Sequence, residues 1–331
     1  MTIFISLIVF GVIVLFHEFG HFIVAKATGV KVHEFAIGMG PKIFSRKGVE
    51  TEYTLRVLPL GGYIRMEGED ASSDDPRSFN KKSVPERAGI ILAGPIMNFI
   101  LSIALFTFIF VSIGVPTTVI KSTIENRPAR EVGLQAGDKI VEIDQSKIKT
   151  WEDVINKIGN SPGKDISIKV KRNDELLTYN VRTIEENGRA VIGIIPKEEK
   201  NILLALRYGF QRVIYILNDM ILFLGRAISG RASSSEIAGP VGILNLVGQA
   251  AETGILNVVS LAAVISLNLG LLNLLPIPAL DGSRVLFLIV EALRGKKIDP
   301  EKEGTVHLIG FVLLMTLMIF VTYKDILRII K

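Results

Sequence analysis

Two histidines and a glutamate, His17, Glu18 and His21, stand close together near the start of the sequence. On a helix, positions four residues apart project from the same face, so the two imidazoles can bind one Zn²⁺ ion. Glu18 would then lie beside the metal as a general base. Zinc lowers the pKa of its bound water toward neutrality, and the glutamate takes the proton as that water attacks a carbonyl carbon. The spacing therefore predicts metal-assisted hydrolysis.

These residues follow an almost purely apolar run, Ile3 to Phe16, which is long enough to begin a membrane span. Ionisable side chains inside such a span are costly and usually functional. The alternative is a charge cluster at a helix end, whose side chains reach toward the membrane surface.

The composition indicates a polytopic membrane protein. Of 331 residues 49% are hydrophobic, and the mean hydropathy is +0.43. The middle of the chain is charged and mixed, so we expect an inserted soluble domain. The net charge of +5 is modest, and no basic tract is interleaved with aromatic residues, which argues against a nucleic-acid partner. The absence of cysteine excludes disulfides, thiolate zinc ligands and a cysteine nucleophile.

The predicted fold is an α-helical membrane protein with four transmembrane helices, a small membrane-associated β-sheet and an inserted α+β domain. Lys26 and Lys31 follow the first span and nothing basic precedes it, so the positive-inside rule places the N-terminus outside the cytoplasm. With four spans, the inserted domain and the C-terminus are also outside. The predicted segments are transmembrane helices at 1–27, 88–115, 254–282 and 305–331, a sheet and loop at 28–87, the inserted domain at 116–198, interfacial helices at 199–253 and a cytoplasmic loop at 283–304.

Residues 28–87 carry strand signals. Val32–Ile37 and Lys42–Arg46 flank Gly38-Met39-Gly40-Pro41, which predicts a hairpin with a glycine turn. Further strands are expected at Thr51–Val57 and Tyr63–Met66. The edge of this sheet could accept an extended peptide by strand addition. The alternative is a plain hairpin with no role in substrate binding.

The inserted domain has a recognisable element order. We expect strands at Val119–Ser122, Lys139–Ile143, Asp165–Arg172 and Leu176–Thr183, a short helix from Pro128 to Gly133, and a helix at Trp151–Ile158 capped by Thr150. With Gly133-Leu134-x-x-Gly137-Asp138 at its centre, this order resembles a PDZ domain of the bacterial protease type. The resemblance implies capture of an extended peptide or a substrate ectodomain, and the alternative is a steric cap that binds nothing.

Residues 201–229 are apolar but are interrupted by Arg207, Arg212 and Asp219. A hydrophobic face with basic flanks favours an interfacial helix, and a fifth span is the competing interpretation. In the second span, Asn98 needs a polar partner, which could be a neighbouring helix or the site itself.

The third span is unusually polar, with three asparagines and two serines from Asn257 to Asn273. One face must therefore line a protein interior or a wet cavity. Pro276 and Pro278 break the helix just before Asp281. The topology brings Asp281 to the same leaflet as the two histidines of the first span.

Catalytic zinc needs three protein ligands and one open position. His33 and His307 have no helical partner at ligand spacing, and we interpret both as structural or solvated. Asp281 is the better third ligand, because it is the acid in the broken-helix segment.

Several further motifs extend over nearly the whole chain. They are Gly38-x-Gly40-Pro41, Phe79-Asn80-x-Lys82-Ser83-Val84, Ala93-Gly94-Pro95-x-x-Asn98, Asn268-Leu269-Gly270 and Asn273-x-x-Pro276-x-Pro278-x-Leu280-Asp281-Gly282. Together with the histidine pair, they resemble the site-2 protease family of zinc intramembrane metalloproteases, and its bacterial branch that cleaves anti-sigma factors and remnant signal peptides.

The resemblance implies a role for each matching residue. His17, His21 and Asp281 would bind zinc, with Glu18 as the base. Asn273, together with Asn268, would steady the substrate backbone or the developing oxyanion. Gly38, Met39 and Gly40 would form part of a membrane-inserted hairpin that guides substrate, with Pro276 and Pro278 assisting. Single-span membrane proteins would be the substrates, and the PDZ-like domain would act outside the cytoplasm as a size filter. The chain has room for one such domain, unlike the two-PDZ members of the family.

These motifs and the predicted spans indicate an enzyme of the plasma membrane. Two other classes of protein are alternatives to this interpretation. One is a catalytically silent scaffold that binds partners through its PDZ-like domain, which the intact Glu18 argues against. The other is a transporter with a midplane ion site, for which no inverted repeat is evident.

Overall fold

The computed structural model describes residues 1–69, 73–186, 188–231 and 238–330. Residues 70–72 of the predicted 28–87 segment and 232–237 of the predicted 199–253 segment lie outside this description. The chain divides into two compact units, one formed by residues 1–106 and 209–331 and the other by residues 107–208. The first is called the membrane unit and the second the PDZ-like unit.

Four helices in the described part of the chain are long and apolar enough to cross a membrane, which confirms the prediction of a polytopic membrane protein. They are α1 (Thr2–Ala27), α2 (Val84–Ile113), α7 (Ile255–Leu274) and α9 (Pro300–Ile330). The 27-residue helix α5 (Ile202–Ile228) is not among these candidate spans, because its charged residues interrupt every long apolar window. The interfacial placement of α5 stays a prediction, with a fifth span as the alternative.

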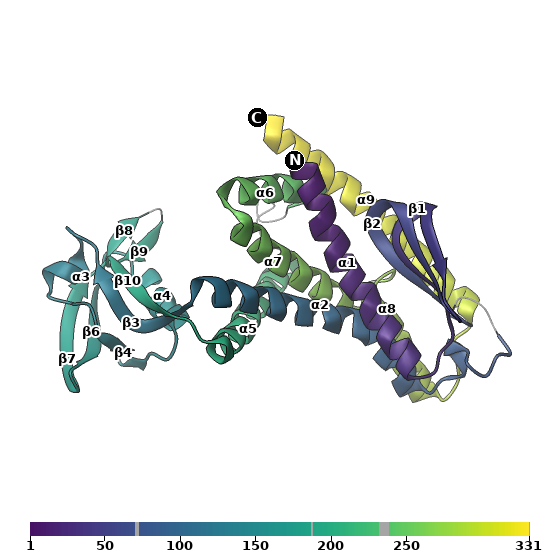
Figure 1. Cartoon of the computed structure of the whole chain (residues 1–331), viewed down its shortest axis with the longest axis horizontal. Coiled ribbons are helices and arrows are strands. Elements are labelled where there is room, and N and C mark those ends of the chain that lie inside the picture. Colours follow the sequence, from purple (N-terminus) through teal and green to yellow (C-terminus); the bar gives the residue numbers. More distant parts are fainter. Residues whose placement is uncertain (70–72, 187, 232–237, 331) are drawn as a thin grey trace. The chain divides into compact units, whose positions relative to one another are not determined.

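Helix α1 lies between the α6–α7 pair on one side and the β1–β2 sheet on the other (Figure 1). Its apolar face packs against α2 and α7 in a core formed by Val9, Ile13, Leu101 and Val258. Gly20 lets the backbones of α1 and α2 touch, since an added Cβ would lie 2.3 Å from the carbonyl oxygen of Ala93.

Hydrogen bonds between side chains and backbone join α2 to α7. Ser266 donates to the carbonyl of Asn98 (2.9 Å), and Ser102 donates to the carbonyl of Ala263 (2.6 Å). In a membrane such polar contacts replace the solvent-driven attraction between helices. Part of the polarity of the third span therefore serves helix packing. The α2–α7 pair in turn gives α1 a rigid support.

The sheet consists of β1 (Val32–Lys47) and β2 (Glu52–Met66). Residues 34–37 have register partners in two segments of β2, 52–55 and 62–65, while residues 42–47 pair with 52–56. The predicted hairpin turn at 38–41 is therefore wrong. The turn lies at 48–51, closed by a hydrogen bond from the Gly48 amide to the Thr51 carbonyl (2.9 Å). Gly38 and Gly40, with φ of 88° and 85°, instead bend β1 so that both of its halves can flank β2.

Two shorter helices complete the membrane unit, α6 (Pro240–Thr253) and α8 (Asp281–Arg294). The N-terminus of α6 is held by α9, because Asp325 accepts a hydrogen bond from the Gly242 amide (2.7 Å). A carboxylate at this helix end also complements the helix dipole. Helix α8 begins with Asp281 directly after the proline-containing loop that follows α7.

The PDZ-like unit contains a sheet in the strand order β10-β3-β4-β6-β7, with β5 added beside β4. Its elements are β3 (Val115–Thr123), α3 (Pro128–Glu131), β4 (Lys139–Ile143), β5 (Ser146–Lys147), α4 (Trp151–Gly159), β6 (Asp165–Arg172), β7 (Glu175–Arg182), β8 (Ile184–Glu186), β9 (Arg189–Val191) and β10 (Ile194–Glu199). Thr150 caps α4 through a capping box with Asp153. The sequence did not predict the β8–β9 hairpin or the last strand, β10, which pairs with β3. The aliphatic side chains of β4 and β6 form the centre of the core.

A buried ion pair joins the loop before β4 to the end of β6. Asp138 is fully buried and accepts hydrogen bonds from Arg172 Nε (2.6 Å) and Nη2 (2.7 Å). Burial raises the pKa of Asp138, but the hydrogen bonds from Arg172 and the Gln135 amide outweigh it and hold the pKa below its usual range. A carboxyl with a depressed pKa stabilises the fold above its unfolded pKa, and this contribution is lost as pH falls through the folded value.

Asp138→Asn is therefore expected to lower the free energy of unfolding of the PDZ-like unit by about 2–3 kcal/mol at pH 7, because Arg172 loses its charged partner. The difference from wild type should persist above about pH 4 and shrink below it. Urea unfolding followed by the fluorescence of Trp151 measures it, since this is the single tryptophan of the chain and packs against the core. The control is Asp174→Asn, which removes an exposed pair with Lys171 and should cost less than about 0.5 kcal/mol. Equal shifts in the two variants would contradict the assignment.

Candidate active site

Helix α1 directs the imidazoles of His17 and His21 to the same place. Their Nε2 atoms lie 3.3 Å apart, and the rings meet edge to face with centroids 4.9 Å apart. Gly94 of α2 makes room for both, since an added Cβ would lie 2.3 Å from His21 Nε2 and 2.8 Å from His17 Cε1. A larger residue at position 94 would displace the rings.

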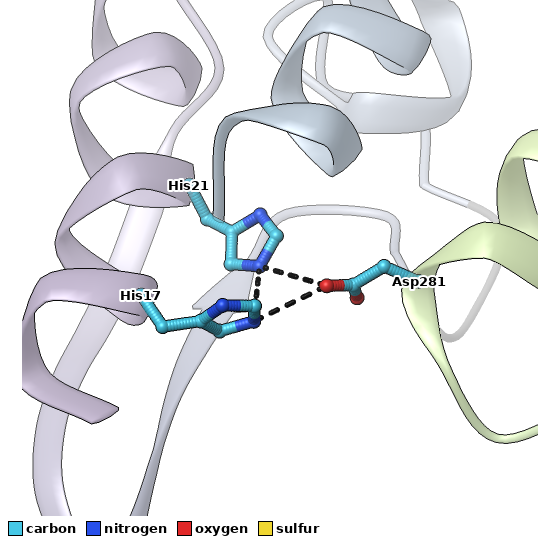
Figure 2. Close-up of side chains that lie close together, drawn as sticks. All are labelled: His17, His21 and Asp281. Carbon is cyan, nitrogen blue, oxygen red and sulfur yellow. Dashed lines mark hydrogen bonds and ion pairs between the residues drawn. The ribbon is translucent and has the colours of Figure 1, made fainter. Parts of the chain in front are cut away.

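Asp281, the first residue of α8, presents its carboxylate to the two rings (Figure 2). Its Oδ2 atom lies 3.2 Å from His17 Nε2 and 3.6 Å from His21 Nε2. Atoms bound to tetrahedral Zn²⁺ at about 2.0–2.1 Å lie about 3.3–3.4 Å from one another. The three separations therefore match the edges of a zinc coordination tetrahedron, and the residues fit the ion.

Hydrogen bonds on the far side of each ring set its orientation. His21 donates from Nδ1 to the carbonyl of Ile90 (2.8 Å), which leaves a lone pair on Nε2. The side-chain amide of Asn98 lies 3.1 Å from His17 Nδ1. Such contacts orient metal-binding histidines in proteins generally. Asp281 Oδ2 is buried and has no hydrogen-bond partner among the described residues. A buried carboxylate oxygen beside two imidazole nitrogens is a donor set that suits a divalent cation.

The three side chains open into a cavity of about 720 Å³ that Glu18 also lines. Residues 62–66 of β2 form another wall of this cavity. Gly62 allows the strand to approach, because an added Cβ would lie 2.9 Å from Glu18 Cγ. The cavity is therefore lined by the Glu18 carboxylate, by the three candidate zinc ligands and by one strand of the sheet.

The remaining residues singled out in the sequence lie at varying distances from this cavity. Asn273 Nδ2 is 3.4 Å from His17 Nε2, whereas Asn268 is exposed on α7 and no hydrogen bond among the described residues links it to the histidines. The other five are not among the residues that line the cavity: Gly38, Met39, Gly40, Pro276 and Pro278. Met39 covers Gly61, and Pro278 packs against α9 at Gly310.

Peptidase family M50 matches residues 5–317 of the chain. The chain belongs to this family. The match confirms the resemblance to site-2 proteases and identifies the protein as a zinc-dependent membrane metalloprotease.

Two relatives and one solved structure illustrate the similarity. Zinc metalloprotease RasP of Geobacillus kaustophilus is 34% identical over 405 residues, covering 97% of this chain and 96% of the relative. Regulator of sigma-W protease RasP of Bacillus subtilis is 34% identical over 415 residues, covering 99% and 98%. The PDZ domain of an SdrC-like protein from Listeria monocytogenes is 27% identical in sequence, with a TM-score of 0.23. The match covers 24% of this M50 chain and 87% of that domain.

Three residues near the site were not assigned to it from the sequence. From the sequence, the polar partner of Asn98 could be a neighbouring helix or the site itself, and in the structure Asn98 contacts His17. Gly94 belongs to one of the sequence motifs, with no role of its own predicted, and in the structure it accommodates the imidazoles. The sequence predicts a structural or solvated His307, and in the structure His307 lines the cavity. For Asn98 and Gly94, the sequence signal was the Gly94-Pro95 pair, which interrupts an apolar run.

Proposed function

We propose that the M50 protein hydrolyses peptide bonds within or beside the membrane-spanning helices of single-span proteins. His17, His21 and Asp281 would bind Zn²⁺, and Glu18 would be the general base. The observation that carries the proposal is the convergence of three ligand atoms, 3.2–3.6 Å apart, in a cavity that Glu18 shares.

The roles of the residues follow from this geometry. Zinc supplies an acidic water and polarises the scissile carbonyl when it is bound. Glu18 takes the proton of the attacking water and delivers it to the leaving amine. The Asn273 amide, close to His17 Nε2, donates a hydrogen bond to the substrate carbonyl oxygen as negative charge develops there. Asn268 and the segment Gly38–Gly40 act farther away, on the path of the substrate.

A membrane helix resists hydrolysis because its carbonyls are bonded internally. The substrate must unwind before water can attack. Residues 62–66 of β2 pair with residues 32–37 of β1 and form one edge of the sheet, on the wall of the cavity. An unwound substrate segment can pair with this edge by strand addition. Pairing would stabilise the extended form next to Glu18.

The substrate class proposed is membrane-anchored anti-sigma factors and remnant signal peptides. It is supported by the name of the Bacillus subtilis relative, a regulator of sigma-W. The PDZ-like unit would either hold a peptide of the trimmed ectodomain or exclude untrimmed ones. Both termini and this unit would lie outside the cytoplasm, and the catalytic centre would face the cytoplasmic leaflet, where Lys26 and Lys31 follow α1.

Removal of the metal tests the proposal. Purified protein in detergent is expected to cleave a single-span model substrate. Treatment with a chelator should remove the bound zinc and the activity together, and added zinc should restore the activity. A bound-zinc protein that cleaves no single-span substrate would favour the scaffold instead. Cleavage that persists in zinc-free protein would contradict the metal assignment.

A further inference from the structure

The loop between α7 and α8, residues 275–280, contains a strained residue. Ala279 has φ of 77°, in the left-handed region that side chains with a Cβ disfavour by roughly 1–2 kcal/mol. The other non-glycine residues with positive φ in the described chain are Asn, Asp or Gln residues of the PDZ-like unit. Ala279 stands two residues before Asp281, so its conformation sets where the carboxylate points. Something in the structure must stabilise this conformation.

His307 of α9 contacts the strained peptide directly. The Ala279 amide donates a hydrogen bond to His307 Nδ1 (3.0 Å). The imidazole is in turn placed by the ring of Phe287 from α8, with centroids 5.7 Å apart at 66°. Because Nδ1 accepts, the ring proton is on Nε2, and the carboxylate of Glu303 lies 3.7 Å from that atom. His307 is therefore a hydrogen-bond acceptor aimed at one backbone amide.

Gly310 lies one turn further along the same face of α9. An added Cβ there would lie 2.2 Å from the Cβ of Pro278 and 2.5 Å from its carbonyl oxygen. The α9 backbone thus rests on Pro278 while His307 binds the next residue. Over the apolar stretch of α9, 6% of the residues are buried, compared with 28–33% in the other three spans.

We propose that His307 is a positioning residue: with Gly310 it holds residues 278–279 in the strained conformation that directs Asp281 toward His17 and His21. The inference rests on the proposed function, in which Asp281 is a zinc ligand. Without the acceptor, Ala279 would relax to negative φ and move the carboxylate. Metal sites tolerate displacements of only about 0.2–0.5 Å.

The test measures zinc affinity by competition with a chelating dye, in the purified full-length protein. His307→Leu removes the acceptor and is expected to weaken zinc binding about 10–100-fold, the range for residues that orient ligands. His307→Asn places an amide oxygen near the position of Nδ1 and should retain most of the affinity. Ala279→Gly in the His307→Leu protein should restore affinity, because glycine adopts this φ without strain.

Two further variants complete the design. Leu313→Ala, on an exposed part of α9, should leave zinc affinity unchanged. Wild-type affinity in His307→Leu, or failure of Ala279→Gly to restore it, would overturn the inference. If Asp281→Ala loses zinc while His307→Leu keeps it, the inference falls and the proposed function stands. If Asp281→Ala keeps zinc, both fall.

Discussion

Replacing Glu18 with glutamine is expected to reduce cleavage of a single-span substrate by about 10²–10⁴-fold, the contribution of a positioned general base. Zinc content should stay at the wild-type level, because Glu18 lines the cavity but is not part of the ligand cluster of His17, His21 and Asp281. Glutamine has nearly the same shape as glutamate, so Gly62 can still approach it. What the variant lacks is a group that can accept a proton from water.

The measurement pairs an initial cleavage rate with metal analysis of the same preparation. Glu69→Gln is a matched control, since Glu69 is another glutamate on the cavity wall and forms an ion pair with Arg284. This control should cleave far faster than the Glu18 variant. Cleavage by Glu18→Gln at the wild-type rate would refute the proposed mechanism. Loss of zinc from it would make Glu18 a ligand instead.

Replacing Asp281 with alanine is expected to weaken zinc binding by more than about 100-fold, the upper end of the effect of residues that merely orient ligands. Asp281 Oδ2 is the one anionic donor facing the two imidazoles within the ligand cluster. Its removal leaves two neutral ligands, and a divalent cation then loses its charge partner. Cleavage should disappear together with the metal.

Competition with a chelating dye measures the affinity of the Asp281 variant. Asp299→Ala is the control, because Asp299 is exposed, lies just before α9 and is absent from the cavity wall. Excess zinc should restore part of the activity of Asp281→Ala if the remaining histidines still bind weakly. Unchanged zinc affinity would show that another residue completes the site.

The PDZ-like unit shows how far local patterns reach. The capping box of α4 and the strands β6 and β7 follow from residues close in sequence, and the structure has them where the pattern indicates. Strand β10 has no such local signal, because its pairing partner β3 lies about 80 positions away. Its existence depends on an open sheet edge that only the folded unit provides.

The sheet of the membrane unit shows a different limit. Gly38 and Gly40 carry a strong turn signal, and they do adopt the left-handed conformation expected of glycine. The same conformation also bends a strand at an irregularity. Local sequence cannot distinguish a turn from a bend, because the difference lies in which distant residues the two halves pair with. Here both halves pair with β2.

By itself, the sequence determined that His17 and His21 share a helix face, that Glu18 adjoins them, that four segments are long and apolar enough to cross a membrane, and that Asp281 follows a broken helix. Each is a local property, set by side-chain periodicity or by proline chemistry. Only the tertiary structure decided that Gly94 makes room for the imidazoles, that Asn98 contacts His17, and that His307 binds the amide of Ala279. These contacts join residues distant in sequence, and they arise when helices pack closely enough for single atoms to decide the fit.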